Sequence, residues 1–268
     1  SLISENSAAN GAGIFASSSA YRLTNTTLSG NTATGDGGGI YLDNSDIAIA
    51  SSTLRQNSAA NGGGVFSTST GTRLINSTVS GNSAANHGGG LFVQYGTTSL
   101  YNTTVTDNFA DSDGADGGRG GGVAAEKISG TLQFLNSIIA ANYETMAFGN
   151  GGVIAVDGDC YGNLTSQGNN IVYDHDNGDC TISGSFTQAY PLLGPLANNG
   201  GPTLTHALLP SSPAIDAGDP LSCNDNFGAP ITTDQRGLPR PAFGFASLRC
   251  DLGAFERQFT LLLPLLLR

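Results

Sequence analysis

The stretch NSAANGGGVF at residues 57–66 recurs along the chain in nearly the same words. It returns as NSAANGAGIF from residue 6, NTATGDGGGIY from residue 31 and NSAANHGGGLF from residue 82. The first asparagine of each of these four stretches serves as a marker, and a fifth asparagine follows at the same spacing. The markers are Asn6, Asn31, Asn57, Asn82 and Asn108. The steps between them are 25, 26, 25 and 26 residues. A fixed period of this length indicates a solenoid, because one unit cannot bury its own apolar face and must stack on its neighbours.

In such a stack, equivalent residues lie above one another at about 4.8 Å per strand, so columns of similar side chains are expected. Three apolar columns follow the period. They are Leu23, Ile49, Leu74, Leu100 and Phe134; Leu28, Leu54, Val79, Val105 and Ile139; and Ile14, Ile40, Val65, Leu91 and Val123. Three columns predict three strands in each coil.

The glycine-rich word disfavours a leucine-rich repeat, which has a similar length. That repeat needs leucines on a helix or 3₁₀ turn, whereas the return arm here is NSAANGGG, and each glycine costs a helix about 1 kcal/mol. The words INSTVSGN and YNTTVTDN, at residues 75–82 and 101–108, favour short strands. We therefore predict an all-β fold, a right-handed parallel β-helix of about 25–26 residues per coil. The hand is the one typical of coils of this length.

Polar and aromatic columns accompany the apolar ones. The marker asparagines form one polar column, and Asn25, Ser51, Asn76, Asn102 and Asn136 form a second. Stacked amides hydrogen-bond along such arrays, so we expect ladders. An aromatic column consists of Phe15, Tyr41, Phe66 and Phe92. Two interpretations remain open for it: packing, which we favour, or an exterior platform for sugar rings.

Composition limits the partners and the compartment. The chain has 39 glycines among 268 residues, no tryptophan and a net charge of −11, which argues against nucleic acid as a partner. Four cysteines allow three connectivities. We predict the bonds Cys160–Cys180 and Cys223–Cys250, outside the regular coils, because each pair brackets a loop-rich segment. Disulfides favour an oxidising, extracytoplasmic setting.

Two acidic loops interrupt the repeat, and each is a candidate calcium site. Closely spaced carboxylates can supply the oxygen ligands of Ca²⁺, although a solvated acidic loop is an equally simple interpretation. The first set is Asp111, Asp113 and Asp116, and the weaker second set is Asp174, Asp176 and Asp179. No other cofactor is expected.

The chain starts inside a repeat and ends in FTLLLPLLLR at residues 259–268. This apolar tail is far shorter than the roughly 20 residues that span a bilayer, so no transmembrane segment is expected. Its leucines need a receiving surface, either on the same chain or on the open first coil of another molecule, which would build fibres head to tail. The candidate assembly residues are Leu261, Leu262, Leu263, Leu265, Leu266 and Leu267.

Long sequence motifs that are characteristic of one family appear after residue 190. LGPLANNGGPTLTHALLPSSPAIDAGD at residues 193–219, TDQRGLPRP at 233–241 and CDLGAFE at 250–256 resemble the choice-of-anchor Q domain of bacterial surface proteins. The glycine-rich words resemble polymorphic outer-membrane protein repeats. These resemblances imply a secreted bacterial surface protein with a β-helix at 1–190 and a choice-of-anchor Q-like module at 191–256 that caps its C-terminal end. The apolar tail follows at 257–268.

The function expected from these features is that of an extracellular or cell-surface structural and adhesive protein, with surface glycans and other copies of itself as candidate partners. The alternative is a polysaccharide-binding module, or a lyase or hydrolase of the β-helix class. Those enzymes need clustered carboxylates on adjacent coils, whereas the exposed coil positions here are Ser, Thr, Asn and Ala. We therefore expect no catalytic residues.

Overall fold

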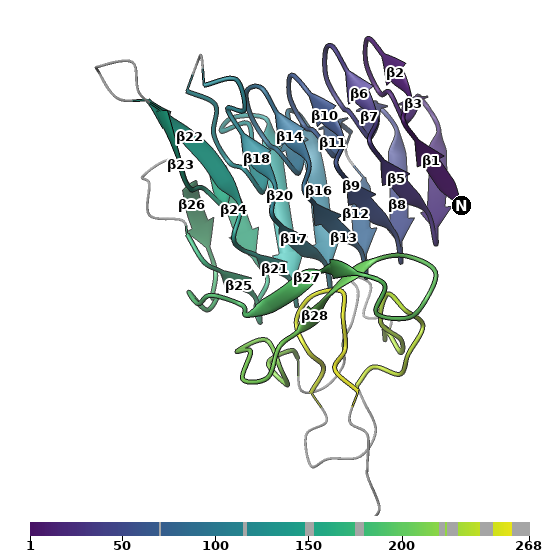
Figure 1. Ribbon diagram of the computed structural model, residues 1–268, viewed down its shortest axis with the longest axis vertical. Helices are drawn as coiled ribbons and strands as arrows, with labels where there is room; N and C mark the ends of the chain where they lie inside the picture. The colour runs from purple at the N-terminus through teal and green to yellow at the C-terminus, as the bar shows by residue number, and fades with distance from the viewer. Residues whose placement is uncertain are drawn as a thin grey trace, which may run out of the picture.

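The chain folds as an all-β parallel solenoid with an irregular C-terminal module, as the computed structural model in Figure 1 shows. The structure describes residues 1–69, 71–114, 117–147, 153–174, 180–219, 223, 230–241 and 249–258. Within these ranges, no helix is long and apolar enough to cross a membrane.

Each regular coil carries four strands, so the prediction of three was wrong. The second coil contains β5 (Thr27–Ser29), β6 (Thr32–Ala33), β7 (Ile40–Asp43) and β8 (Asp46–Ala50). The unpredicted strand is β6, with its equivalents in the other coils. It is only two residues long, too short to show an alternation of apolar and polar residues.

Equivalent strands of successive coils pair in parallel and form stacked sheets. The first sheet has seven strands: β1 (Leu2–Ser4), β5, β9 (Thr53–Arg55), β13 (Thr78–Ser80), β17 (Thr104–Thr106), β21 (Ile138–Ile139) and β25 (Ile171–Val172). The second has β2 (Ser7–Ala8), β6, β10 (Ser58–Ala59), β14 (Ser83–Ala84), β18 (Phe109–Ala110), β22 (Tyr143–Ala147) and the antiparallel β23 (Val153–Asp157).

The third and fourth faces of the solenoid join into one 12-stranded sheet, because the long strand β24 (Cys160–Ser166) pairs with both. One face contains β3 (Ile14–Ser17), β7, β11 (Val65–Thr68), β15 (Leu91–Val93) and β19 (Val123–Ala125). The other contains β4 (Ala20–Thr24), β8, β12 (Thr72–Ile75), β16 (Gly96–Tyr101) and β20 (Gly130–Leu135), with β26 (Cys180–Ser183) beyond β24.

The three predicted apolar columns are confirmed by the strand register. Leu28 pairs with Leu54, and Leu54 with Val79, while Ile14 lies opposite Ile40 in the neighbouring sheet. All three columns meet in one core cluster inside the solenoid. At about 25 cal/mol per Å² of apolar surface removed from water, this continuous cluster is the main stabilising element of the coils.

The marker asparagines form a continuous hydrogen-bonded ladder. It lies at the turns between the strands of the first sheet and those of the second. The side chain of Asn57 donates to Asn82 Oδ1 at 2.9 Å and to the Leu28 carbonyl at 3.1 Å. Asn82 repeats the pattern with Asn108 and Leu54. Each amide after Asn6 is therefore fully used, since its Oδ1 also accepts from the backbone N–H and the side chain of the preceding asparagine. The members are Asn6, Asn31, Asn57, Asn82, Asn108 and Asn142.

The second polar column does not form the expected amide ladder. Its members adopt left-handed φ values of 46–51° and turn the chain between strands. The hydrogen bonds run one residue later: Thr26 N–H donates to Ser52 Oγ at 3.1 Å, and Ser52 N–H to Ser77 Oγ at 3.3 Å. Asparagine tolerates the left-handed region, which explains its recurrence at these turns. The members with this conformation are Asn25, Ser51, Asn76, Asn102 and Asn136.

The third glycine of each repeated word is required by the close approach of the next coil. A Cβ placed on Gly39 would lie 2.5 Å from the carbonyl oxygen of Gly64, and one on Gly64 would lie 2.5 Å from that of Gly90. Stacked backbone therefore occupies the space where a side chain would be, which explains why the glycines recur with the period.

The first disulfide lies inside the solenoid rather than outside it. Cys160 pairs in register with Val123 and bonds to Cys180, with the two Cα atoms 5.6 Å apart. Cys180, Ile182 and Phe186 then pack against the apolar core at its C-terminal end. The segment that covers the last coil thus belongs to the region assigned to the β-helix.

The C-terminal module lies along the side of the stack instead of capping its end (Figure 1). Its only regular strands among the described residues are β27 (Leu193–Ala197) and β28 (Thr205–Leu208), an antiparallel pair. Gln235 donates to Thr53 Oγ1 at 2.9 Å and accepts from Thr78 Oγ1 at 2.7 Å. Ala254 N–H donates to Thr104 Oγ1 at 3.0 Å. The module therefore spans the first sheet across successive coils, and the predicted end cap was wrong.

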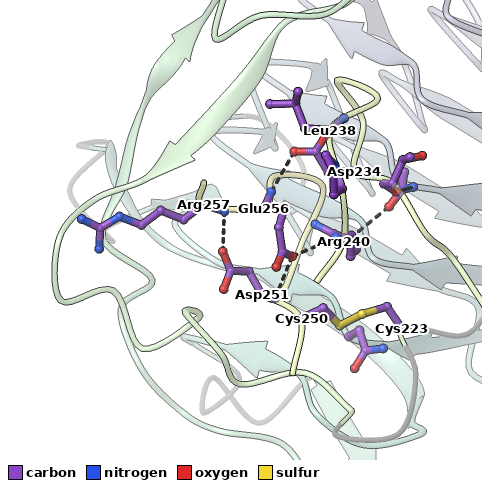
Figure 2. A network of polar contacts seen from close by, with 12 residues as sticks. Cys223, Asp234, Leu238, Arg240, Cys250, Asp251, Glu256 and Arg257 are labelled. Atoms are coloured by element: carbon purple, nitrogen blue, oxygen red, sulfur yellow. Dashed lines mark hydrogen bonds and ion pairs between the residues drawn. A yellow bond between two sulfur atoms is a disulfide. The ribbon is translucent and has the colours of Figure 1, made fainter. Parts of the chain in front are cut away.

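A buried charged network explains the specific words of the module (Figure 2). Arg240 donates to Glu256 Oε2 at 3.1 Å and to Asn76 Oδ1 at 3.0 Å, which joins TDQRGLPRP to CDLGAFE and both to the solenoid. Asp234 accepts from Glu256 N–H at 3.0 Å and forms an ion pair with Arg236 at 2.7 Å. The second predicted disulfide, Cys223–Cys250, is present beside this network.

Candidate functional site

A stack of aromatic rings runs along the outer face of the sheet that contains β3, β7, β11, β15 and β24. The rings of Phe15 and Tyr41 stack with centroids 5.1 Å apart, and those of Tyr41 and Phe66 with centroids 4.9 Å apart. Phe66 and Phe92 continue the stack at 5.6 Å. Tyr41, Phe66 and Phe92 belong to a cluster separate from the solenoid core, so the aromatic column faces outward.

Exposure changes along this stack and decides which rings a ligand can reach. Phe15 is 55% exposed, whereas Phe66 and Phe92 are 1% and 5% exposed. The buried middle of the column therefore serves packing, as favoured from the sequence. Only its two ends and its flanks offer surface to a partner.

His87 extends the stack at β19, which has the small residue Ala124 where the preceding strands have an aromatic residue. Ala124 follows Phe92 in register, and Tyr161 follows Ala124. The His87 ring comes from a turn and stacks on Tyr161 at 5.2 Å, with Phe92 at 6.0 Å. Lys127 Nζ lies 5.0 Å from the Tyr161 ring centroid. The rings thus remain in contact across the missing aromatic.

The environment of His87 fixes its protonation state. Its Nδ1 accepts from Arg119 N–H at 3.0 Å, and its own backbone N–H donates to Asn61 Oδ1 at 3.2 Å. Burial lowers the pKa of His87 below its ordinary value, although the negative charge of Glu126 acts in the opposite direction. The imidazole is therefore neutral near pH 7, with its proton on Nε2.

A groove opens beside this end of the stack. It encloses about 330 Å³ and is lined by Asn61, Asn86, His87, Phe92, Gln94 and Gly118. Amides, an imidazole and an aromatic ring on one concave surface can bind a ligand that has both hydroxyl groups and an apolar face. Sequence reasoning missed His87 and Gln94. The signal for His87 is the single residue inserted into NSAANHGGG relative to NSAANGGG.

The first candidate calcium loop has two described carboxylates in different environments. Asp111 is buried, adopts a left-handed conformation and has an Oδ1 atom without a hydrogen-bond partner among the described residues, whereas Asp113 is exposed. Asp116 lies outside the described residues. Across the part of the chain that the structure describes, no group of three His, Cys, Asp or Glu side chains is arranged to hold a metal ion.

The second candidate loop is described only at Asp174. Its backbone N–H donates to Asp159 Oδ2 at 2.7 Å, which ties this residue to the end of the asparagine ladder. Asp176 and Asp179 lie outside the described residues. So do the candidate assembly residues Leu261, Leu262, Leu263, Leu265, Leu266 and Leu267.

A serine–histidine pair lies between the module and the solenoid. His206 Nε2 is 2.9 Å from Ser80 Oγ, and His206 Nδ1 is 2.7 Å from the Gly194 carbonyl oxygen, to which it donates. Both side chains are buried, and burial lowers the pKa of His206. Because Ser80 is only 3% exposed, this pair joins β13 to β28 rather than presenting a nucleophile to a substrate.

One repeat of the chain resembles a known family. A family model for the Chlamydia polymorphic membrane protein repeat matches residues 25–43, which run from the left-handed Asn25 to the end of β7. No curated protein and no solved structure matches the chain significantly.

Proposed function

We propose that this protein is a bacterial surface rod, secreted or held at the cell surface, that has a structural and adhesive role and no catalytic one. The observation that carries the proposal is the asparagine ladder, which continues without a break from Asn6 to Asn142 beside one apolar core. Such a stack is stiff along its axis and repeats the same outer surface in each coil.

Two further observations support a surface location. The repeat that matches the Chlamydia polymorphic membrane protein family lies in one of the regular coils. The two disulfides suit an oxidising compartment outside the cytoplasm. The words at 193–219, 233–241 and 250–256, which meet in the module, support its assignment to the choice-of-anchor Q type.

The location is tested on intact native cells. We expect antibodies against the folded protein to label unpermeabilised cells or the medium, and external protease to remove the cell-bound signal. A signal that appears only after lysis would refute the proposal. Adhesion is tested with beads coated with the folded protein, which should bind surfaces that beads coated with reduced, unfolded protein do not bind.

The rival class is an enzyme acting on polysaccharides. Incubation with oligogalacturonides and calcium should release neither unsaturated products nor new reducing ends. Turnover that persists in purified protein would replace the adhesive role with catalysis.

The proposal extends to association end to end. The first coil leaves Ile3, Ile14 and Leu23 partly exposed, whereas their equivalents Leu28, Ile40 and Ile49 in the next coil are buried. Exposed apolar side chains and strand edges favour stacking of another coil. We expect the full chain to associate more strongly than a chain ending at Glu256. Equal, monomeric light scattering of the two at high concentration would refute this extension.

A further inference from the structure

The groove beside Phe92 is built on a rigid frame. Gln94 is fixed by its backbone, since its N–H donates to the Ser67 carbonyl at 2.9 Å and its carbonyl accepts from Ser129 Oγ at 2.7 Å. Asn86 N–H donates to the Ala60 carbonyl at 2.8 Å, and Asp111 N–H donates to the Asn86 carbonyl at 3.0 Å. The side chains of both residues therefore start from ordered backbone.

The polar groups of these two side chains are not used by the fold. Among the described residues, neither the Asn86 amide nor the Gln94 amide has a hydrogen-bond partner, although both residues line the groove. Each amide offers a donor and an acceptor side by side. The neutral imidazole of His87 adds a donor at Nε2, because Nδ1 is occupied by Arg119 N–H.

The apolar part of the groove comes from the aromatic stack. Phe92 is 5% exposed and contributes little surface to the lining, so the half-buried ring of His87, held between Phe92 and Tyr161, is the ring that a ligand can reach. Gly118 lines the groove at a point of close backbone approach, since a Cβ placed on it would lie 2.2 Å from the Asn86 carbonyl oxygen. The volume of about 330 Å³ is at the lower end of the range usual for small-molecule sites, which fits one or two rings rather than a long chain.

We propose that this groove binds a neutral saccharide unit of a surface glycan. Vicinal hydroxyl groups of a sugar donate and accept at once, as the two amides and the imidazole require, and the C–H face of the ring suits the aromatic edge. Acidic sugars are disfavoured by the net charge of −11 and by Glu126 and Asp111 near His87, although Arg119 supplies a positive charge there as well. This inference rests on the proposed adhesive role and gives it a site and a ligand class.

The test measures binding of neutral tetrasaccharides built from glucose, galactose, mannose or N-acetylglucosamine to the full chain, with tetragalacturonate as the charged comparison. Calorimetry gives the affinity, and amide chemical shifts locate the contact. We expect at least one neutral tetrasaccharide to bind with millimolar affinity or better and to perturb the amides around Asn86 and Gln94, while tetragalacturonate binds more weakly.

Two groove variants and one matched control complete the design. Asn86→Ala and Gln94→Ala should each weaken binding roughly tenfold, since each removes hydrogen bonds from a desolvated contact. Asn163→Ala, which changes an exposed amide of β24 opposite Thr181 of β26, should leave binding unchanged. Circular dichroism and thermal midpoints verify that all three variants fold.

Each contrary result overturns a different claim. The groove is refuted as a sugar site if none of the neutral tetrasaccharides binds at about 10 mM. It is also refuted if the affinity is unchanged in both groove variants. If beads coated with these variants still adhere to surfaces, the adhesive role stands without the groove. If antibody labelling places the protein inside cells, the proposed function fails whatever the sugar binding.

Discussion

Asp159 ends the asparagine ladder by accepting two hydrogen bonds from Asn142, one from its backbone N–H at 2.9 Å and one from its Nδ2 at 2.8 Å. An asparagine at this position could pass a donor on to a further coil, whereas an ionised carboxylate only accepts. The ladder therefore has a direction, and its last member differs chemically from the others.

The first prediction concerns the pH dependence of stability at Asp159. Burial raises the pKa of Asp159 to about 7. The hydrogen bonds from Asp174 and Asn142 favour the ionised form and lower the pKa, but their effect is smaller than that of burial. A raised folded-state pKa means that the contribution to stability is fully present below about pH 4 and is lost as the pH rises through 7. The loss is on the order of 3–4 kcal/mol.

Denaturant unfolding at several pH values, compared between the wild type and Asp159→Asn, measures this contribution. The comparison removes the opposite trend of His87 and His206, whose lowered pKa values reduce stability on acidification. Parallel pH profiles for the two proteins would contradict the prediction.

The second prediction is that replacing a single ladder asparagine costs several times more stability than replacing an exposed asparagine. Asn82→Ala removes the acceptor of Asn57 and the donor to Asn108, and leaves buried groups on both neighbours unpaired. The expected loss in the free energy of unfolding is about 2–4 kcal/mol. Asn163→Ala, which removes one exposed hydrogen bond, should cost less than about 0.5 kcal/mol. Equal losses in a denaturant titration would argue against the ladder.

The third prediction tests the glycine column. Gly64→Ala places a Cβ 2.5 Å from the Gly90 carbonyl oxygen, so two coils must separate. We expect a loss of more than about 2 kcal/mol, or failure to fold. At Gly194 the nearest atom to an added Cβ is 3.6 Å away, so Gly194→Ala is the matched control and should be nearly neutral. A stable, native-like Gly64→Ala protein would show that the stacking is looser than described.

The fourth prediction separates the docking of the module from the stability of the solenoid. Gln235→Ala removes hydrogen bonds to Thr53, Thr78 and Leu204. Hydrogen exchange should quicken in β27 and β28 while the amides of β11 and β15 keep their protection, because those strands lie on another face. Exposed Gln167 provides the control, and Gln167→Ala should leave both regions unchanged. Uniform acceleration in the Gln235 variant would mean that the two parts unfold together.

The fifth prediction concerns calcium at the loop that contains Asp111 and Asp113. The Oδ1 atom of Asp111 is buried and has no hydrogen-bond partner in the part of the chain that the structure describes, so a cation would satisfy it. Calorimetry should detect weak, millimolar binding to the wild type and none to Asp111→Asn. Asp43→Asn, on an exposed strand end, provides the charge-matched control. Absence of heat with the wild type at millimolar calcium would remove this site.

The repeat period of the sequence predicted the structural features that recur in every coil. The three apolar columns followed from spacing alone, since burial repeats with each coil, and Ile40, Val65 and Leu91 lie where the period places them. The turn asparagines were misread for a physical reason. Both polar columns repeat equally well in sequence, but only the backbone conformation distinguishes a left-handed turn residue such as Asn76 from a ladder residue such as Asn82.

Contacts between distant segments left no periodic signal. Nothing in the neighbourhood of Gln235 or Arg240 indicates that their partners are Thr53 and Asn76, more than 150 residues away. The module was therefore assigned to the end of the solenoid by resemblance, whereas its contacts lie along the side. The site at His87 was missed because no other repeat has a histidine where NSAANHGGG inserts one, so the insertion was visible but the period assigned it no role.

The directional ladder also determines how the length of this molecule can change. In each inner coil the ladder asparagine accepts hydrogen bonds from the preceding coil and donates one to the next coil, so the coils are interchangeable units. The described contacts of the module begin at Ser51, which leaves the first coil outside its reach. Duplicating one repeat in the sequence there would lengthen the rod by about 4.8 Å without disturbing either the module or the terminal carboxylate. Recombination between repeats would therefore change the length of the solenoid one coil at a time.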